Sequence, residues 1–137
     1  MLTRGNGLQK TDFSENGVGC IHYGQIYTYY GLFAYETKSF VTQEMSQRLK
    51  KVNPGYLIIT LTIENIEDVC KCVAWLGNES IVTGGHAAIF KHNQNPKYIA
   101  YCFQSDQFYK QKCKIANGTK VIEVSPQKLE KILIPIP

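Results

Sequence analysis

The sequence has no apolar run long enough to span a membrane, because its longest, residues 56–63, is only strand-sized and contains two threonines. Its first residues, 1–4, lack the apolar core of a secretory signal peptide. The five cysteines are odd in number and none are in CxxC spacing, which argues against a disulfide framework. We therefore expect a cytoplasmic protein whose cysteines stay reduced, mostly among apolar neighbours.

Acidic residues are nearly missing from a long stretch of the chain. Between Glu79 and Glu123 the only acid is Asp106. The same stretch contains these cations and histidines: Lys91, Lys97, Lys110, Lys112, Lys114, Lys120, His86 and His92. A surface with one sign of charge attracts a polyanion, and nucleic-acid phosphate is the commonest polyanion. The net charge of +4 is mild, and the alternative is a solvated basic face without a partner.

No set of nucleophile, base and orienting residue stands out. The segment Gly84-Gly85-His86 matches neither a P-loop nor a dinucleotide-binding loop. Cys20 and His22 are two residues apart on an expected strand, so they share a face without the approach that a thiol hydrolase needs. We expect no enzyme, and a small hydrolase built on Cys20 or Cys102 is kept as a third class of function.

Metal ligands are equally scarce. Cys70, Cys72 and His86 give a Cys-x-Cys pair with one distant histidine, which is poor spacing for zinc. Four ligands do not converge in the sequence, and we expect no metal in this chain.

What the sequence does contain is a mixture of short strand and helix patterns without the alternation typical of βαβ units. The expected strands are residues 20–23, 56–61, 72–76, 80–82 and 87–90. Helix starts are expected at Thr42, Asn95, Ser105 and Ser125. The turn at residues 77–79 predicts that strands 72–76 and 80–82 form a hairpin. We expect an α+β fold: one irregular domain over residues 1–137, with a twisted, mostly antiparallel sheet and several short helices.

The two helices that follow Asn95 and Ser105 have apolar residues at helical spacing. In the first, Tyr98, Ile99, Tyr101, Cys102 and Phe103 are expected on one packed side. In the second, Phe108, Tyr109 and Cys113 are expected to point inward, which leaves Lys110, Lys112 and Lys114 for solvent.

Polar and aromatic clusters flanked by glycine suggest recognition of DNA. They are residues 4–11, 23–30, 80–91 and 117–120. Such side chains read bases in the grooves of a duplex, while cations contact its backbone. The candidates for reading bases are Lys10, His22, Tyr23, Gln25, Tyr27, His86 and Thr119. The candidates for phosphate contacts are Lys91, Lys110, Lys112, Lys114 and Lys120. We expect both sets on one surface, although several tyrosines can instead fill the core.

A series of segments in a fixed order carries a family resemblance. They are RGNGLQKTDF (4–13), GVGCIHYGQIYTYYG (17–31), ETKSFVTQE (36–44), PGYLIIT (54–60), ENIEDVCKCVAWLG (64–77), VTGGHAAIFKH (82–92), NPKYIAYCFQSDQFYKQK (95–112) and GTKVIEVSPQKLEKILIPIP (118–137). Together they resemble a target recognition domain of the specificity subunit of Type I restriction–modification enzymes.

The resemblance implies a domain that reads one half of a bipartite sequence in double-stranded DNA. It implies a methyltransferase (modification) subunit as partner and, through it, the restriction subunit, with no membrane involved. Methyl transfer and cleavage would then use S-adenosylmethionine and ATP in those subunits, and this chain would hold no cofactor. In the family, a segment like Ile-Pro-Ile-Pro leads into a spacer helix, which we expect to be absent here. The alternative is a truncated module that binds methyltransferase subunits and modulates assembly without reading DNA.

Overall fold

The computed structural model describes residues 2–5, 7–63, 68–118 and 122–135. Within these ranges the strands are β1 (Leu2–Arg4), β2 (Val18–Ile21), β3 (Phe33–Ala34), β4 (Ser39–Val41), β5 (Lys50–Val52), β6 (Leu57–Thr60), β7 (Thr62–Ile63), β8 (Cys72–Trp75), β9 (Ile81–Thr83), β10 (Ala87–Phe90) and β11 (Ile122–Glu123). They form a five-stranded sheet in the order β1-β10-β6-β8-β3, a four-stranded sheet in the order β4-β2-β9-β5, and the pair β11-β7.

Most neighbouring strands in these sheets are antiparallel, and only the pairs β2–β9 and β3–β8 are parallel. The expected α+β class with mostly antiparallel pairing is confirmed, with the strands divided among three sheets.

The helices are short, and most begin where the sequence places a capping residue. They are η1 (Lys10–Asp12), α1 (Tyr23–Thr28), α2 (Gln43–Ser46), α3 (Pro96–Cys102), α4 (Asp106–Ile115) and α5 (Pro126–Leu129). The side chains of Thr42, Asn95, Ser105 and Ser125 accept backbone N–H groups at the starts of α2, α3, α4 and α5. No helix among the described residues is long and apolar enough to cross a membrane.

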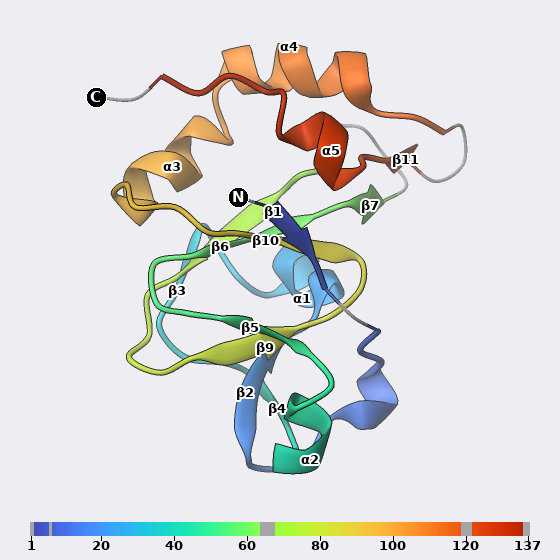
Figure 1. Ribbon diagram of the computed structural model, residues 1–137, viewed down its shortest axis with the longest axis vertical. Helices are drawn as coiled ribbons and strands as arrows, with labels where there is room; N and C mark the ends of the chain where they lie inside the picture. The colour runs from blue at the N-terminus through green and yellow to red at the C-terminus, as the bar shows by residue number, and fades with distance from the viewer. Residues whose placement is uncertain (1, 6, 64–67, 119–121, 136–137) are drawn as a thin grey trace.

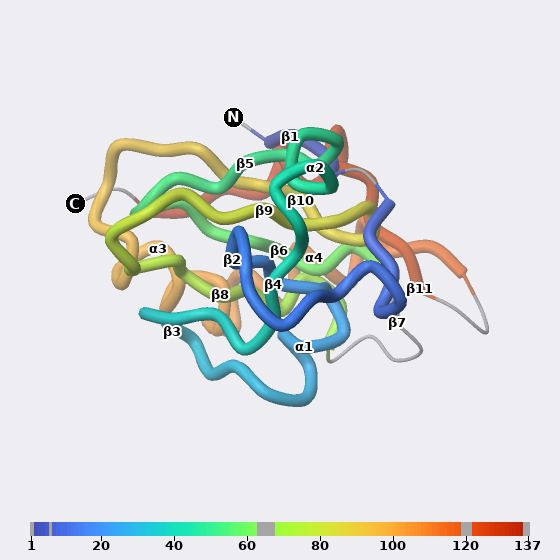
Figure 2. Tube along the Cα trace, turned by 90° about the horizontal axis from the view of Figure 1, so that it is seen from below, coloured from blue at the N-terminus to red at the C-terminus, as the bar shows by residue number. Residues whose placement is uncertain are grey.

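The five-stranded sheet lies between two layers. Figure 1 shows α3, α4 and α5 above this sheet, and α1 and the four-stranded sheet below it. Figure 2, seen from below, shows β2 and β4 in front of the other strands. The middle strand β6 is buried on both faces: Leu57 and Ile59 join the apolar core beneath the helices, while Ile58 joins the core toward α1. A strand covered on both sides favours a continuous apolar run, as at residues 57–59, and the buried Thr60 that ends β6 donates its hydroxyl to the Lys71 carbonyl at 3.0 Å.

The turn before β6 depends on a glycine. Gly55 has a φ of 94°, and the Tyr56 N–H donates to the Asn53 carbonyl at 3.1 Å. A residue with a side chain adopts this left-handed conformation only with strain.

The predicted hairpin of residues 72–76 and 80–82 is wrong. β8 pairs with β6 and β3, whereas β9 pairs with β2 and β5 in the other sheet. In the connection between them the Trp75 indole N–H donates to the Glu79 carbonyl at 2.7 Å, and the backbone at Gly77 lies close against the Trp75 ring. The short turn signal was correct, but the strands that flank it belong to different layers.

Parts of the predicted helix faces are also wrong. On α4 the residues that pack inward are Phe108 and Lys112, while Tyr109 and Cys113 are exposed. On α3 the buried residues are Ile99 and Ala100, and Tyr101 is 59% exposed. In both helices the packed stripe is narrower than the apolar residues suggest, because tyrosine and cysteine are also found at the surface.

Candidate nucleic-acid interface

Four of the predicted base-reading residues line one cavity of about 460 Å³. They are Lys10, His22, Tyr23 and His86. The other lining residues are Gly7, Leu8, Gln9 and Gly85. Three segments that are distant in the sequence thus meet: the stretch leading into η1, the start of α1, and the turn between β9 and β10.

Close backbone contact holds two of these segments together. β1 pairs with β10, and beyond the last pair the Gly5 N–H donates to the Ala87 carbonyl at 3.0 Å. A Cβ atom placed on Gly5 would lie 2.1 Å from the carbonyl oxygen of Gly84, so only glycine fits there. The Arg4 side chain adds a hydrogen bond from Nε to the Gly85 carbonyl at 3.1 Å.

His22 is the N-cap of α1 and is only 9% exposed. Its Nδ1 atom accepts the Gly24 N–H at 3.1 Å, so the neutral ring has its proton on Nε2. Burial lowers the pKa of His22, and the charges of Lys10 and His86 lower it further, while a hydrogen bond with the Leu8 backbone raises it. The ring thus joins α1 to the segment before η1 as a neutral group.

Gln25 and Tyr27, on the same helix, also use their polar atoms within the fold. The Gln25 side-chain oxygen accepts the His22 N–H at 3.0 Å, and its Nε2 donates to Ser39 Oγ at 2.7 Å. The Tyr27 hydroxyl donates to the Thr62 carbonyl at 3.1 Å, and burial raises its pKa. Base reading by these residues stays a prediction, but their polar groups already have partners inside the protein.

The groups that remain for a ligand are on Lys10, Tyr23 and His86. The Tyr23 ring contacts two imidazoles, with its centroid 4.7 Å from that of His22 and 4.8 Å from that of His86. His86 is exposed, and its Nδ1 lies 3.0 Å from Thr62 Oγ1, which fixes the ring while Nε2 stays available. Lys10 is exposed at the first position of η1. The cavity therefore combines a cation, an imidazole and a phenol.

None of the described phosphate candidates lines this cavity. Lys110 and Lys114 are exposed on α4, at the top of Figure 1 and away from α1, and Lys91 is exposed just after β10. The expectation that Lys112 faces solvent is wrong, because it is 5% exposed and its Nζ lies 4.9 Å from the centre of the Tyr109 ring. Thr119 and Lys120 lie outside the described residues.

Arg4 is the cation beside the cavity that the sequence analysis did not select as a site residue. It is exposed, and its guanidinium is fixed by Gly85. Its position directly before Gly5-Asn6-Gly7 is the signal that could have found it, since a cation beside glycine-flanked backbone suits a phosphate.

The cysteines give no sign of a reactive thiol in the buried part of the protein. Burial raises the pKa of Cys20 and of Cys70 to about 12, so neither thiol is ionised near neutral pH. The His22 ring beside Cys20 caps α1 through Nδ1, which is therefore not available as a base for a thiol. Among the described residues no group of three or more His, Cys, Asp or Glu side chains is placed to hold a metal ion.

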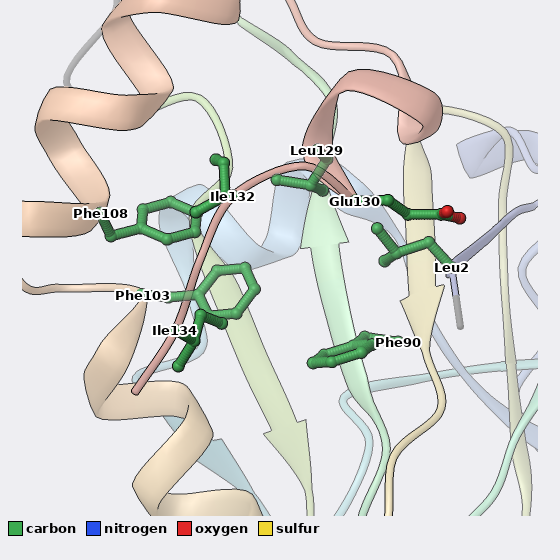
Figure 3. A pocket seen from close by; sticks show the side chains of 8 residues that line it. All are labelled: Leu2, Phe90, Phe103, Phe108, Leu129, Glu130, Ile132 and Ile134. Atoms are coloured by element: carbon green, nitrogen blue, oxygen red, sulfur yellow. The ribbon is translucent and has the colours of Figure 1, made fainter. Parts of the chain in front are cut away.

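A second cavity, of about 270 Å³, is apolar and lies on the helical side of the five-stranded sheet. Figure 3 shows Phe103, Phe108 and Ile132 on one side of it and Leu129 on the other. Its remaining lining residues are Leu2, Phe90, Glu130 and Ile134. The C-terminal segment that forms part of its wall is held by Gln111, which accepts the Leu133 N–H at 2.8 Å and donates to the Leu133 carbonyl at 3.0 Å.

The fold has a solved counterpart. A Type I restriction–modification S subunit from M. genitalium superposes on 99% of this chain with a TM-score of 0.58 and 11% sequence identity. The chain shares the fold of that region. A second structure, described as showing complex assembly and conformational transition of the Type I R-M system, covers 96% of the chain with a TM-score of 0.46 and 13% identity.

The counterparts are much longer than this chain. It spans about a third of each, 31% and 33% of their lengths. No family model matches the sequence, and no curated protein does. The likeness is therefore one of fold.

Proposed function

We propose that this domain recognises one half of a bipartite sequence in double-stranded DNA as part of a Type I restriction–modification complex. The observation that carries the proposal is the cavity in which Lys10, Tyr23 and His86 converge. Lysine, histidine and tyrosine side chains held on a glycine-rich framework suit the edges of bases in the major groove. The shared fold with a specificity subunit supports the same proposal.

The partners and location follow from this proposal. A methyltransferase subunit would bind the domain and supply methyl transfer with S-adenosylmethionine, and a restriction subunit would join through it and use ATP. The domain itself would hold no cofactor and catalyse no step. It would act in the cytoplasm, where it would contribute to defence against foreign DNA.

Backbone contacts are needed in addition to base contacts. Lys91, Lys110 and Lys114 remain candidates for the phosphates, together with Lys120. Arg4 is an additional candidate, because its side chain is bonded to Gly85 in the wall of the cavity. The plot of log affinity against log salt has a negative slope, and loss of one phosphate contact reduces the magnitude of that slope by about 0.9.

Selection from random duplex DNA tests the proposal. The full chain, with and without a methyltransferase subunit, is expected to enrich one sequence, with an affinity that falls steeply as salt rises. Absence of enrichment in both conditions would contradict it.

The apolar cavity of Figure 3 favours a second candidate function, docking of a protein partner. Seven of its eight lining side chains are apolar, and Leu133 beside it is 80% exposed. In this alternative the module binds methyltransferase subunits without reading DNA. Docking through an apolar surface depends weakly on salt, so the salt dependence separates the two functions.

A further inference from the structure

We propose that the cavity bordered by η1, α1 and the turn before β10 binds the major-groove edge of guanine, with N7 and O6 of the base as hydrogen-bond acceptors. The inference rests on the proposed function and names the chemical class of base that this site reads.

Most acceptors in the cavity wall already have donors. The backbone carbonyls of five lining residues accept from within the fold: Gln9 from Asp12 N, Lys10 from Phe13 N, His22 from Gln25 N, Gly85 from Arg4 Nε, and His86 from Leu61 N. The ring nitrogen Nδ1 of His22 accepts the Gly24 N–H. None of the eight lining residues, all of which the structure describes, is acidic. A ligand therefore finds few acceptors here.

Donors, in contrast, remain available. Lys10 is exposed, and its ammonium group has three N–H donors and no acceptor. The Thr62 hydroxyl lies 3.0 Å from Nδ1 of His86, and in the tautomer in which it donates to that nitrogen, the ring has its own N–H donor at Nε2. Donors from two separate segments thus border the same space.

Guanine is the base that matches two donors. In the major groove it shows N7 and O6 side by side, and lysine pairs with both. Adenine shows N7 next to the N6 amino group, and cytosine shows its N4 amino group. Those amino groups would meet the donors of Lys10 and His86 and find only the Tyr23 hydroxyl as an acceptor, and an unpaired polar group at a contact is costly.

A phosphate shares the acceptor chemistry, but the walls favour a planar base. The rings of His22, Tyr23 and His86 lie close together in this wall, with the Tyr23 centroid 4.7 Å from that of His22 and 4.8 Å from that of His86. Aromatic faces pack well against flat heterocycles. A phosphate needs no such walls, because exposed cations on a convex surface suffice for it.

The experiment starts from a duplex selected from a random pool by the wild-type chain together with the methyltransferase subunit. Each guanine of that duplex is replaced in turn by 7-deazaguanine, which lacks the N7 acceptor. The replacements are tested against wild type, Lys10→Met, His86→Ala and Lys128→Gln. Lys128 is the matched control, because it is an exposed lysine on α5 and does not line the cavity.

At one position of the duplex, 7-deazaguanine in place of guanine is expected to weaken the binding of wild type and of Lys128→Gln by about 5- to 150-fold. This loss corresponds to about 1–3 kcal/mol of binding free energy at ~1.4 kcal/mol per tenfold. Lys10→Met and His86→Ala should bind more weakly and no longer distinguish guanine from 7-deazaguanine at that position.

Three results would overturn the inference. If a sequence is enriched but no guanine is sensitive, or the variants keep the discrimination, DNA reading stands and the guanine assignment fails. If the variants weaken every duplex alike and lower the salt slope, Lys10 and His86 contact phosphate instead. If no sequence is enriched at all, the proposed function and this inference fail together.

Discussion

The neutral ring of His22 offers a sharp test of how the site is built. His22→Leu removes the acceptor for the Gly24 N–H while it retains most of the buried volume, and it leaves that N–H without a partner. Loss of an N-cap, or of the partner of a buried donor, costs about 1–3 kcal/mol. For a domain of this size the midpoint of thermal unfolding should fall by about 3–4 °C for each kcal/mol.

His22→Asn is the matched variant, because asparagine is a strong N-cap and keeps an acceptor for Gly24. It should lose less than half as much unfolding free energy as His22→Leu in thermal or urea unfolding. Equal losses in the two variants would refute capping as the role of the ring.

The pH dependence of stability gives an independent check on the same residue. The pKa of His22 is lowered from its ordinary value of 6.5, so below pH 6.5 the unfolded chain binds more protons than the folded one. The contribution of His22 to the unfolding free energy is therefore complete above pH 6.5, and it is lost as the pH falls toward the lowered pKa of the folded state. The difference in unfolding free energy between wild type and His22→Asn should shrink over that interval. A difference that stays constant with pH would show that the ring is not held neutral.

Three further predictions concern other parts of the molecule. Gly5→Ala should lower the unfolding free energy by about 1–3 kcal/mol in urea titration, because the new Cβ meets a backbone oxygen. Gly7→Ala is the control: its Cβ has open space, so the unfolding free energy should stay unchanged. Equal losses in the two variants would contradict the close contact at Gly5. Arg4→Gln should reduce the magnitude of the slope of log affinity for DNA against log salt by about 0.9, measured in binding titrations at several salt concentrations. Lys128→Gln should leave the slope unchanged. An unchanged slope in Arg4→Gln would argue against a phosphate contact by Arg4. Gln111→Ala should speed hydrogen exchange at the C-terminal backbone N–H that Gln111 accepts, measured by NMR, while global stability changes little; unchanged exchange would show that the side chain does not hold the segment.

Local chemistry made much of the secondary structure predictable. Capping side chains and N-terminal prolines leave few alternatives, so Asn95-Pro96 and Ser125-Pro126 marked helix starts that the structure confirms. The helix α1 was missed because its cap is a histidine, and because its aromatic residues also fit a strand.

The tertiary arrangement was less accessible from sequence. A turn signal cannot say whether the strands on either side of it pair, and β8 and β9 enter different sheets. Nor does periodicity distinguish a lysine at the surface from Lys112, whose ammonium group packs over Tyr109.

The candidate site was predictable as a set of residues and not as a geometry. Lys10, His22, Tyr23 and His86 line one cavity, whereas Gln25 and Tyr27 from the same set of candidates do not. Which of these side chains serve the fold and which stay available to a ligand depends on tertiary contacts that the sequence does not show. His22 caps a helix, while His86, which has the same side chain, is exposed and held by Thr62.

The central claim is that DNA binds at this cavity, and amide chemical shifts measure that most directly. On titration with the selected duplex, we predict the largest shifts at Gly7, Lys10, Tyr23, Gly85 and His86, with little change on α5. Shifts confined to α5 and the lining of the apolar cavity, with none at Gly85 or His86, would contradict the account.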